Sequence, residues 1–419
     1  MASTLSTPAR RFGALVCAIL TFGFSAGSRE HAHPGRADSP LIVHEWGTFT
    51  SIAGADGSAI EWLPLSARYD LPSFVERYRN APAKAGLRGT IRMETPVLYF
   101  YSARETTVSV HVAFHHGLIT EWYPHATPAQ PPDSSPRKFT VDTETRGGIS
   151  WNAVSIAPHL VVNLPRESAA SHYYAARETS AAPLFVESPT GAQHEKFLFY
   201  RGVASFSPPI SARILSDNRL ALRNRDAHMV PALILFERRG DKLGYRLLPP
   251  LVSSAVVDTP STSGTLDSLR ADFEQLLIAQ GLYADEAHAM LETWRDSWFE
   301  EGSRLFYIVP RSFVDSVLPL SIDPAPMQMT RAFVGRIELI TPATQNAVEA
   351  ALLSGDDRTL EKYDRFLTSI VESISPEDSP STRDLQLRDS LSSYLARTLP
   401  RTLTRFSSTA SGDSSRERR

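Results

Sequence analysis

Residues 94–124 constrain the fold of this chain most, because they contain three successive apolar runs. The run Val97–Tyr101 lacks helical spacing and is typical of a strand buried on both faces. Across Val108–Phe114, large apolar residues alternate with smaller or polar ones, which is the period of a half-buried strand. The third run begins at Leu118, after His115-His116-Gly117. The stretch therefore predicts three strands around which the rest of the chain packs.

The loop around Gly117 decides how the second and third of these strands pair. A two-residue loop would place Glu121 opposite Val112 on the apolar face, where a carboxylate is costly to bury. A three-residue loop with Gly117 in the left-handed conformation keeps that face apolar, so we predict this register. Its cross-strand pairs are Phe114 with Leu118, Val112 with Thr120 and Val110 with Trp122, with His111 opposite Glu121 on the other face.

Strand patterns extend over the first part of the chain. The segment Leu41–Trp46 predicts a strand that ends at Gly47, and Ala53–Ser58 contains the Gly and Asp residues of a turn. Further short strands, separated by turn residues, predict an antiparallel β-sandwich or jelly-roll-like domain over 41–258. The clearest later strands are predicted at 195–200, 231–237 and 243–248, the last two as a hairpin.

Helical spacing begins after residue 258. Leu266–Leu277 carries an apolar stripe that ends at Gly281, and Ala287–Trp298 carries a second one, so the two segments predict a helical hairpin. Later signals are strand patterns at 305–309 and 331–340 and a helix that starts at Pro342. We therefore predict an α+β fold in which a mixed α+β C-terminal domain occupies 259–374.

The two ends of the chain have different compositions. Arg10-Arg11, the apolar run Phe12–Phe24 and the small residues after it have the layout of a signal peptide, predicted over 1–27. This run is shorter than the roughly 20 apolar residues of a membrane helix, so we predict no transmembrane span in the mature chain. A polar linker over 28–40 follows. The predicted location is periplasmic or extracellular.

The C-terminal residues 375–419 are rich in Ser, Arg and Asp. Such a segment buries little apolar surface, so we predict a polar and largely disordered tail. The leucines within Leu387–Leu399 allow one amphipathic helix there.

Composition narrows the classes of partner and chemistry. A formal net charge of −3 over 419 residues, without a basic cluster, argues against nucleic-acid binding. The single cysteine, Cys17, lies in the predicted signal peptide, so the mature chain would be cysteine-free, with no disulfide or thiolate ligand. The sequence also lacks the G-x-S-x-G, P-loop, H-E-x-x-H and dinucleotide-binding motifs.

His44, Glu45 and Trp46 form the first candidate site. Strand alternation puts His44 and Trp46 on one face and Glu45 on the other, so His44 and Glu45 need a bulge to act together. The simpler interpretation is one inward-facing and one outward-facing residue.

His111 and Glu121, next to Trp122, form the second candidate site. The predicted hairpin would bring His111 and Glu121 together as ligands of a divalent metal, and a third ligand is needed. Candidates for that ligand are His44, His125 and His159. The simpler interpretation is a surface ion pair beside the histidines of the turn.

Four long motifs stand out along the chain: VHEWGTFTS at 43–51, METPVLYFY at 93–101, GLITEWYP at 117–124 and TWRDSWFEEGSRLFYIVPR at 293–311. They resemble motifs of a family of exported bacterial proteins. The resemblance spans about 41–342 and implies export. The family is uncharacterised, so the resemblance implies no activity, cofactor or catalytic residue.

Taken together, these patterns predict an exported envelope protein that binds a ligand or a protein partner. The first alternative is a metal-dependent enzyme of sandwich or jelly-roll type with His and Glu ligands. The second is a glycan-processing enzyme, which needs two carboxylates facing each other in a cleft. The candidates for these carboxylates are Glu45, Glu61, Glu94 and Glu121.

Overall fold

The computed structural model describes residues 40–66, 70–78, 86–129, 140–168, 171–375 and 381–398. The predicted signal peptide, and all of the predicted linker except Pro40, lie outside the described residues. The strands in chain order are β1 (Ile42–Ala53), β2 (Glu76–Arg77), β3 (Ile91–Tyr101), β4 (Thr106–His115), β5 (Gly117–Tyr123), β6 (Thr127–Ala129), β7 (Arg146–Ile156), β8 (Leu184–Ser188), β9 (Gly191–Glu195), β10 (Leu198–Ala204), β11 (Ile210–Ile214), β12 (Leu220–Asn224), β13 (Leu233–Arg239), β14 (Lys242–Leu248), β15 (Ser254–Val257), β16 (Gly302–Ile308), β17 (Leu320–Asp323) and β18 (Gln328–Leu339).

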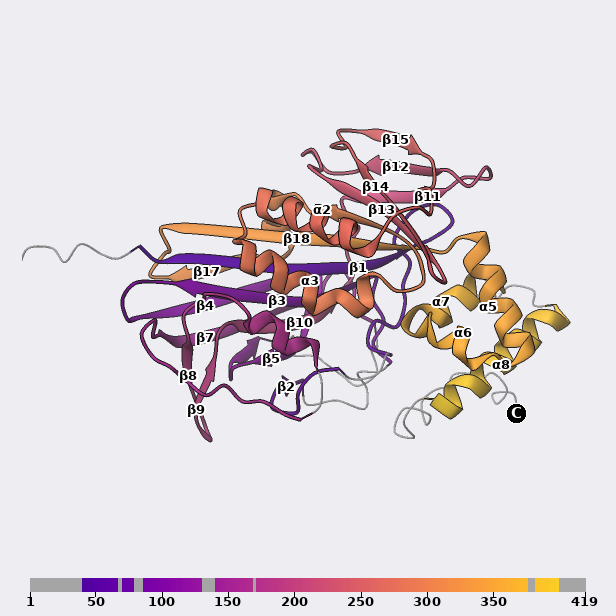
Figure 1. Ribbon diagram of the computed structural model, residues 1–419. Coiled ribbons are helices and arrows are strands. Elements are labelled where there is room, and N and C mark those ends of the chain that lie inside the picture. Colours follow the sequence, from indigo (N-terminus) through magenta and orange to yellow (C-terminus); the bar gives the residue numbers. More distant parts are fainter. Residues whose placement is uncertain are drawn as a thin grey trace, which may run out of the picture. The chain divides into compact units, whose positions relative to one another are not determined.

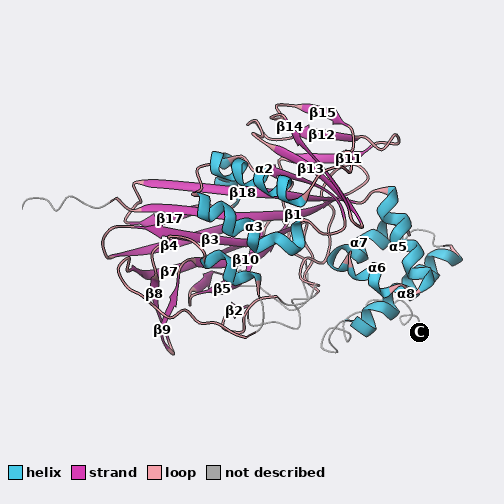
Figure 2. Ribbon diagram, in the orientation of Figure 1, coloured by secondary structure: helices cyan, strands magenta, loops and turns pink. Residues whose placement is uncertain are grey.

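Helices follow mostly in the second half of the chain. In chain order they are η1 (His172–Arg177), α2 (Leu266–Ala279), α3 (Ala284–Trp298), α4 (Arg311–Val317), α5 (Pro342–Ser354), α6 (Asp357–Glu361), η2 (Asp364–Phe366), α7 (Leu367–Ile374) and α8 (Thr382–Thr398). Figure 2 shows α5, α6, α7 and α8 as one group, apart from α2 and α3, which lie over the strands. The helical hairpin predicted from the two apolar stripes is confirmed as α2 and α3.

One mixed sheet contains most of the described strands (Figure 1). Its main path has the order β14-β13-β16-β18-β1-β3-β10-β5-β7-β4-β17, and β11, β12 and β15 form a separate three-stranded sheet. The α+β class is thus confirmed. The predicted sandwich or jelly roll is not what the described strands show, because they join into one large sheet with a parallel pair at its centre.

That central pair is β1 with β18, in parallel register from Ile42 opposite Gln328 to Ala53 opposite Leu339. β1 also pairs with β3 in antiparallel fashion, and this register shifts between Trp46 and Thr48. The strand therefore continues through Gly47, where we predicted its end. A Cβ at Gly47 would lie 2.7 Å from the Phe333 ring, so this irregularity depends on glycine.

The boundary predicted at 258 lies between strands of the same sheet. β16 and β18 belong to the predicted domain 259–374, yet β16 pairs with β13 and β18 pairs with β1. Residues Ser39–Arg419 form one compact unit. A local pattern identifies a strand but not its partner, so the domain boundary at 258 stays a prediction.

Alternate residues of the central strands pack on opposite faces of the sheet. On one face, Trp46 and Tyr99 join the apolar residues of α2, α3 and η1. On the other, Val43 and Phe100 join those of β4 and β7. Burial on both faces explains why Val97–Tyr101 is almost continuously apolar, as the sequence predicted.

The predicted hairpin of β4 and β5 is wrong. β4 pairs with β7 and β17, whereas β5 pairs mainly with β10. His116, with a φ of 60°, is the single residue between the two strands and takes the left-handed conformation that we assigned to Gly117. Gly117 is needed for another reason, because a Cβ there would lie 2.4 Å from the Phe114 ring. The chain thus turns a corner instead of folding back on itself.

The amphipathic helix that the sequence allows within Leu387–Leu399 is present in the described part of the predicted tail. Residues Thr382–Thr398 form α8, which buries Leu387, Leu391 and Tyr394. These side chains join α5, α7, Ile52 and Trp62 in a third apolar cluster. Apolar residues at helical spacing therefore outweigh the polar composition. Residues 399–419 lie outside the described part of the chain.

Candidate functional site

The residues His44 and Glu45 point to opposite faces of β1, as alternation predicts, and both are fully buried. His44 Nδ1 lies 2.8 Å from Glu286 Oε2 on α3, and Glu286 Oε1 accepts a hydrogen bond from the Tyr101 hydroxyl at 2.8 Å. Trp46 is buried on the same face as His44. His44 and Trp46 therefore contribute to the core between β1 and α3 and line no described cleft.

Glu45 is held by partners on neighbouring strands. Its Oε1 accepts a hydrogen bond from the Tyr200 hydroxyl and its Oε2 one from Arg331 Nε, both at 2.5 Å. Arg331 Nη1 also donates to Asp315 Oδ1 at 2.7 Å. Burial by itself would lower the pKa of Arg331, but Glu45, Tyr200 and Asp315 together outweigh burial and raise it. Glu45 is thus one half of a buried ion pair.

His111 and Glu121 are not brought together. His111, on β4, is exposed, and its Nδ1 lies 2.8 Å from Ser150 Oγ. Glu121, on β5, is buried and accepts a hydrogen bond from Thr120 Oγ1 at 2.5 Å. The two were predicted to meet only because β4 and β5 were paired with each other.

Trp122 and His125 instead share Glu76, which the sequence did not single out. Trp122 Nε1 donates to Glu76 Oε2 at 2.9 Å, and His125 Nδ1 lies 2.8 Å from Glu76 Oε1. His159 lies elsewhere, with its Nε2 3.1 Å from the carbonyl oxygen of Ala103. Among the described residues, no three His, Cys, Asp or Glu side chains are placed to hold a metal ion.

The four carboxylates considered for glycan processing do not form a pair in a described cleft. Glu45, Glu94 and Glu121 are almost completely buried. Glu61 is exposed and lies 3.6 Å from Arg88. A sugar could reach only the last of these groups.

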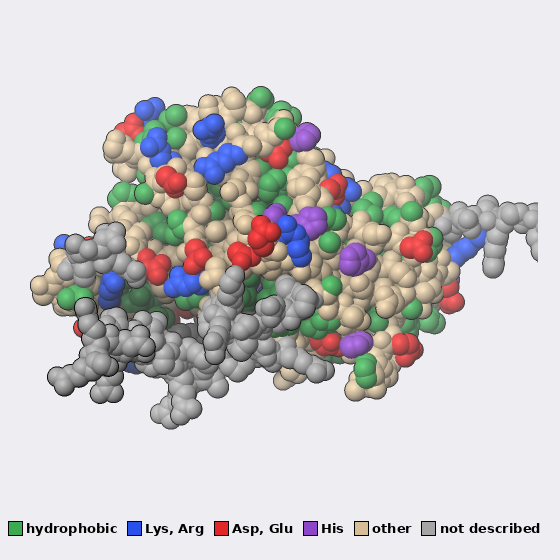
Figure 3. Space-filling model, turned by 180° about the vertical axis from the view of Figure 1, so that it is seen from behind, with side chains coloured by type: hydrophobic (Ala, Val, Ile, Leu, Met, Phe, Trp, Pro, Cys, Tyr) green, Lys and Arg blue, Asp and Glu red, His purple; other side chains and the backbone are tan. Residues whose placement is uncertain are grey.

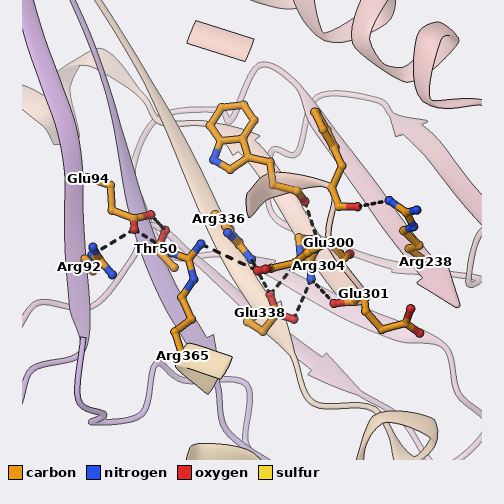
Figure 4. A network of polar contacts seen from close by, with 12 residues as sticks. Thr50, Arg92, Glu94, Arg238, Glu300, Glu301, Arg304, Arg336, Glu338 and Arg365 are labelled. Atoms are coloured by element: carbon orange, nitrogen blue, oxygen red, sulfur yellow. Dashed lines mark hydrogen bonds and ion pairs between the residues drawn. The ribbon is translucent and has the colours of Figure 1, made fainter. Parts of the chain in front are cut away.

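A buried network of arginines and carboxylates joins the sheet to the C-terminal helices (Figure 4). Glu94 on β3 accepts a hydrogen bond from Thr50 Oγ1 at 2.7 Å, and Arg365 Nη1 of η2 lies 2.9 Å from its Oε1. Arg92 Nε lies 3.1 Å from the same oxygen. The other members continue across β18 and β16 through Arg336, Glu300, Glu338 and Arg304.

These charges keep the carboxylates ionised. Burial by itself would raise the pKa of Glu94, but Arg92 and Arg365 outweigh it and lower the pKa to about 2. Arg304 and Arg336 likewise outweigh burial and lower the pKa of Glu338. Since Arg365 immediately precedes Phe366 and α7, its ion pair with Glu94 fixes α7 against the end of the sheet.

A groove of about 510 Å³ lies between α7 and the end of β1. One wall of the groove comes from β1, β11 and the turns that follow these two strands. The other wall comes from Ile340, α5 and α7. The lining residues are Ala53, Gly54, Ala55, Ile60, Ala212, Ile214, Leu215, Ser216, Ile340, Pro342, Gln345, Ser369, Glu372 and Ser373.

Two local structures predicted from sequence shape this groove. In the turn at Ala53–Ser58, Gly54 N–H donates to the Ser58 carbonyl at 2.8 Å, and Gly57 has a φ of 84°, which favours glycine. Across the groove, Thr341 caps α5 by accepting from Thr344 N–H, and Pro342 occupies the first turn. Both predictions are confirmed.

The lining of the groove is partly aliphatic and partly polar. Aliphatic side chains form much of the surface, and hydroxyl and amide groups are gathered on the helical wall. Gln345 Nε2 donates to Ser373 Oγ at 3.2 Å, which orients both groups. Among the described residues that line the groove, Glu372 is the one charged residue, and it has an interaction partner within the fold.

Comparisons with known proteins add little to this description. No protein-family model and no curated protein matches the chain. One similar solved structure is the yeast delta-COP-I mu-homology domain complexed with Dsl1 WxWxV peptide, at 7% identity, over 72% of this chain and 96% of that chain. Its TM-score is 0.24, so no inference about fold or function rests on it. Within the described ranges, no helix is both long and apolar enough to cross a membrane.

Proposed function

We propose that this protein is an exported binding protein that binds a small amphipathic ligand in the groove between α7 and the end of β1. The observation that supports it best is the lining itself, because aliphatic walls would hold the apolar part of a ligand and the helical wall would hydrogen-bond its polar end. The carboxylate of Glu372, although it has a partner in the fold, disfavours an anionic polar end relative to a cationic or neutral one.

A screen of matched small amines and carboxylates by thermal shift and NMR tests the groove. Amines with an aliphatic or aromatic body should bind and carboxylates of the same shape should not. Ala55→Trp, at the exposed edge of the groove, should block binding, whereas Ala350→Trp on the exposed side of α5 should not. Glu372→Gln should reduce the preference for amines by roughly tenfold, the loss of one charge-assisted contact.

Two outcomes would contradict this function. One is equal binding of amines and carboxylates, and the other is binding that persists unchanged in Ala55→Trp. The metal-dependent and glycan-processing alternatives have less support, because their candidate residues lie apart from one another and away from the groove.

Export is also a proposal, supported by the order of basic, apolar and small residues at Arg10–Ser28. The intact mass of the protein secreted by a bacterial host tests export and cleavage. A secreted chain that still begins at Met1 would contradict cleavage near Gly27.

Membership of the exported family rests on motifs in β1, β3, β5 and the region of α3 and β16. None of the groove residues lies in these four motifs.

A further inference from the structure

The three-stranded sheet β11-β12-β15 has one face packed on the core and one face that is not. Alternation puts Ala212 and Leu222 into the core, while Arg213 of β11 and Arg223 of β12 are exposed on the other face. This second face is concave and forms a pocket of about 510 Å³, separate from the ligand groove. Its lining residues are Asp56, Ser211, Arg213, Ala221, Leu222, Arg223, Arg225, Ser254, Ala255 and Val256.

Two of the three arginines that line this pocket have no acidic partner within the described part of the chain. Within the described part of the chain, neither Arg213 nor Arg223 makes a hydrogen bond or an ion pair. Arg225 Nη2 donates to Ser58 Oγ at 3.0 Å, a neutral group. By contrast, Arg219, in the turn between β11 and β12, pairs with Asp217 at 2.7 Å. The same small sheet thus pairs one arginine and leaves two without partners.

Stability does not explain this arrangement. In the observed register Arg213 is opposite Ala221 and Arg223 is opposite Ser211, so the two arginines are diagonal neighbours. Such positions are about 7–8 Å apart, and like charges there repel. Among the described lining residues, Asp56 is the one acid against three arginines, and hydrogen bonds from Ser58 together with the charge of Arg225 lower its pKa. It already accepts a hydrogen bond from Ser58 N–H at 2.9 Å. Figure 3 shows Lys and Arg side chains gathered over the upper part of the molecule, where Figure 1 places this sheet.

We propose that this pocket binds a soluble ligand carrying two linked phosphate groups. Guanidinium groups match phosphate oxygens in geometry and charge, and two separated arginines suit two phosphates better than one. The hydroxyls of Ser211 and Ser254 add hydrogen-bond donors on the same surface. The concave shape fits a compact anion, whereas a flat lipid surface would not reach its base. This site is independent of the amine-binding groove, because its lining has the opposite charge and shares no residue with it.

A calorimetric titration of the full chain with pyrophosphate at low ionic strength tests the proposal. The double variant Arg213→Gln/Arg223→Gln should weaken binding at least tenfold, since each lost contact is charge-assisted. The matched control is Arg219→Gln/Arg246→Gln, which removes the same charge from two exposed arginines that have acidic partners, Asp217 and Asp258. This control should bind pyrophosphate with the same affinity as the native chain.

Any one of three other results would overturn the proposal. Equal losses in the two double variants would mean that net charge alone attracts the anion. Binding to phosphatidylglycerol vesicles without binding to pyrophosphate would assign the pocket to a membrane surface. A lower melting temperature of Arg213→Gln/Arg223→Gln than of the control would give these arginines a structural role instead.

Discussion

Glu94 illustrates how one carboxylate can hold two distant parts of this chain together. It is almost completely buried on β3, yet it lies within ion-pair distance of both Arg92 and Arg365. The sequence placed Glu94 at the start of an apolar run and gave no sign of its partner Arg365, because an ion pair between residues so far apart follows from no local pattern. The structure makes it the anchor of η2 and α7.

Replacing Glu94 by Gln should destabilise the protein by roughly 3–5 kcal/mol, because two buried guanidiniums lose their counter-charge. Urea unfolding at pH 7 measures this change. The exposed pair of Glu61 with Arg88 provides the control, and Glu61→Gln should cost less than about 1 kcal/mol. Equal effects of the two substitutions would contradict the anchoring role of Glu94.

The same carboxylate predicts a pH dependence. The folded state lowers the pKa of Glu94 from 4.5 to about 2, so its contribution is complete above 4.5 and is lost as the pH falls toward 2. Converted to free energy, this lowering of the Glu94 pKa contributes roughly 3 kcal/mol to the free energy of unfolding. Between pH 5 and pH 3, the free energy of unfolding should therefore fall less steeply in Glu94→Gln than in the native chain.

At the scale of elements, α8 shows how a few buried side chains decide the state of a polar segment. Leu387 is completely buried against the third apolar cluster, whereas Leu385, two residues earlier on α8, is 53% exposed. Composition averages over such positions, but helical spacing separates them, and only the surface of α5 and α7 turns that spacing into a docked helix.

These two leucines form a matched pair for experiment. Leu387→Ala should destabilise the protein by about 2–5 kcal/mol, the range for a buried leucine, and Leu385→Ala should stay within about 0.5 kcal/mol. Chemical unfolding of both variants measures the difference. If both substitutions leave stability unchanged, α8 does not dock against α5 and α7.

For the whole molecule, the central place of β18 makes the sheet depend on the entire chain. β1, near the start of the described residues, has β18 along its whole length as its parallel neighbour. A fragment that ends at residue 258 would lack β16 and β18 and expose one edge of β1 and one of β13. The same pairing brings the turn after β1 close to α5, and so creates the groove.

Residues 41–258 expressed alone should therefore be insoluble or unfolded, whereas 40–398 should give a cooperative thermal transition. Soluble yield and the dispersion of the amide NMR spectrum measure the difference between the two fragments. A well-folded 41–258 fragment would support the domain boundary predicted from the change of sequence period, and would show that β1 has another stable partner.

The sequence by itself determined the α+β class, the hairpin of β13 and β14, the helical hairpin, the turn at Ala53–Ser58 and the helix at Pro342. Each follows from apolar period or from turn and cap residues within a few positions. The tertiary structure alone decided the partners of β4, β5 and β18, the ion pairs of Glu45 and Glu94, and the groove. Buried strands look alike in sequence whichever strand they pair with, and a buried charge gives no local sign of the group that neutralises it. Those choices depend on how well distant surfaces pack together, which no short stretch of sequence contains.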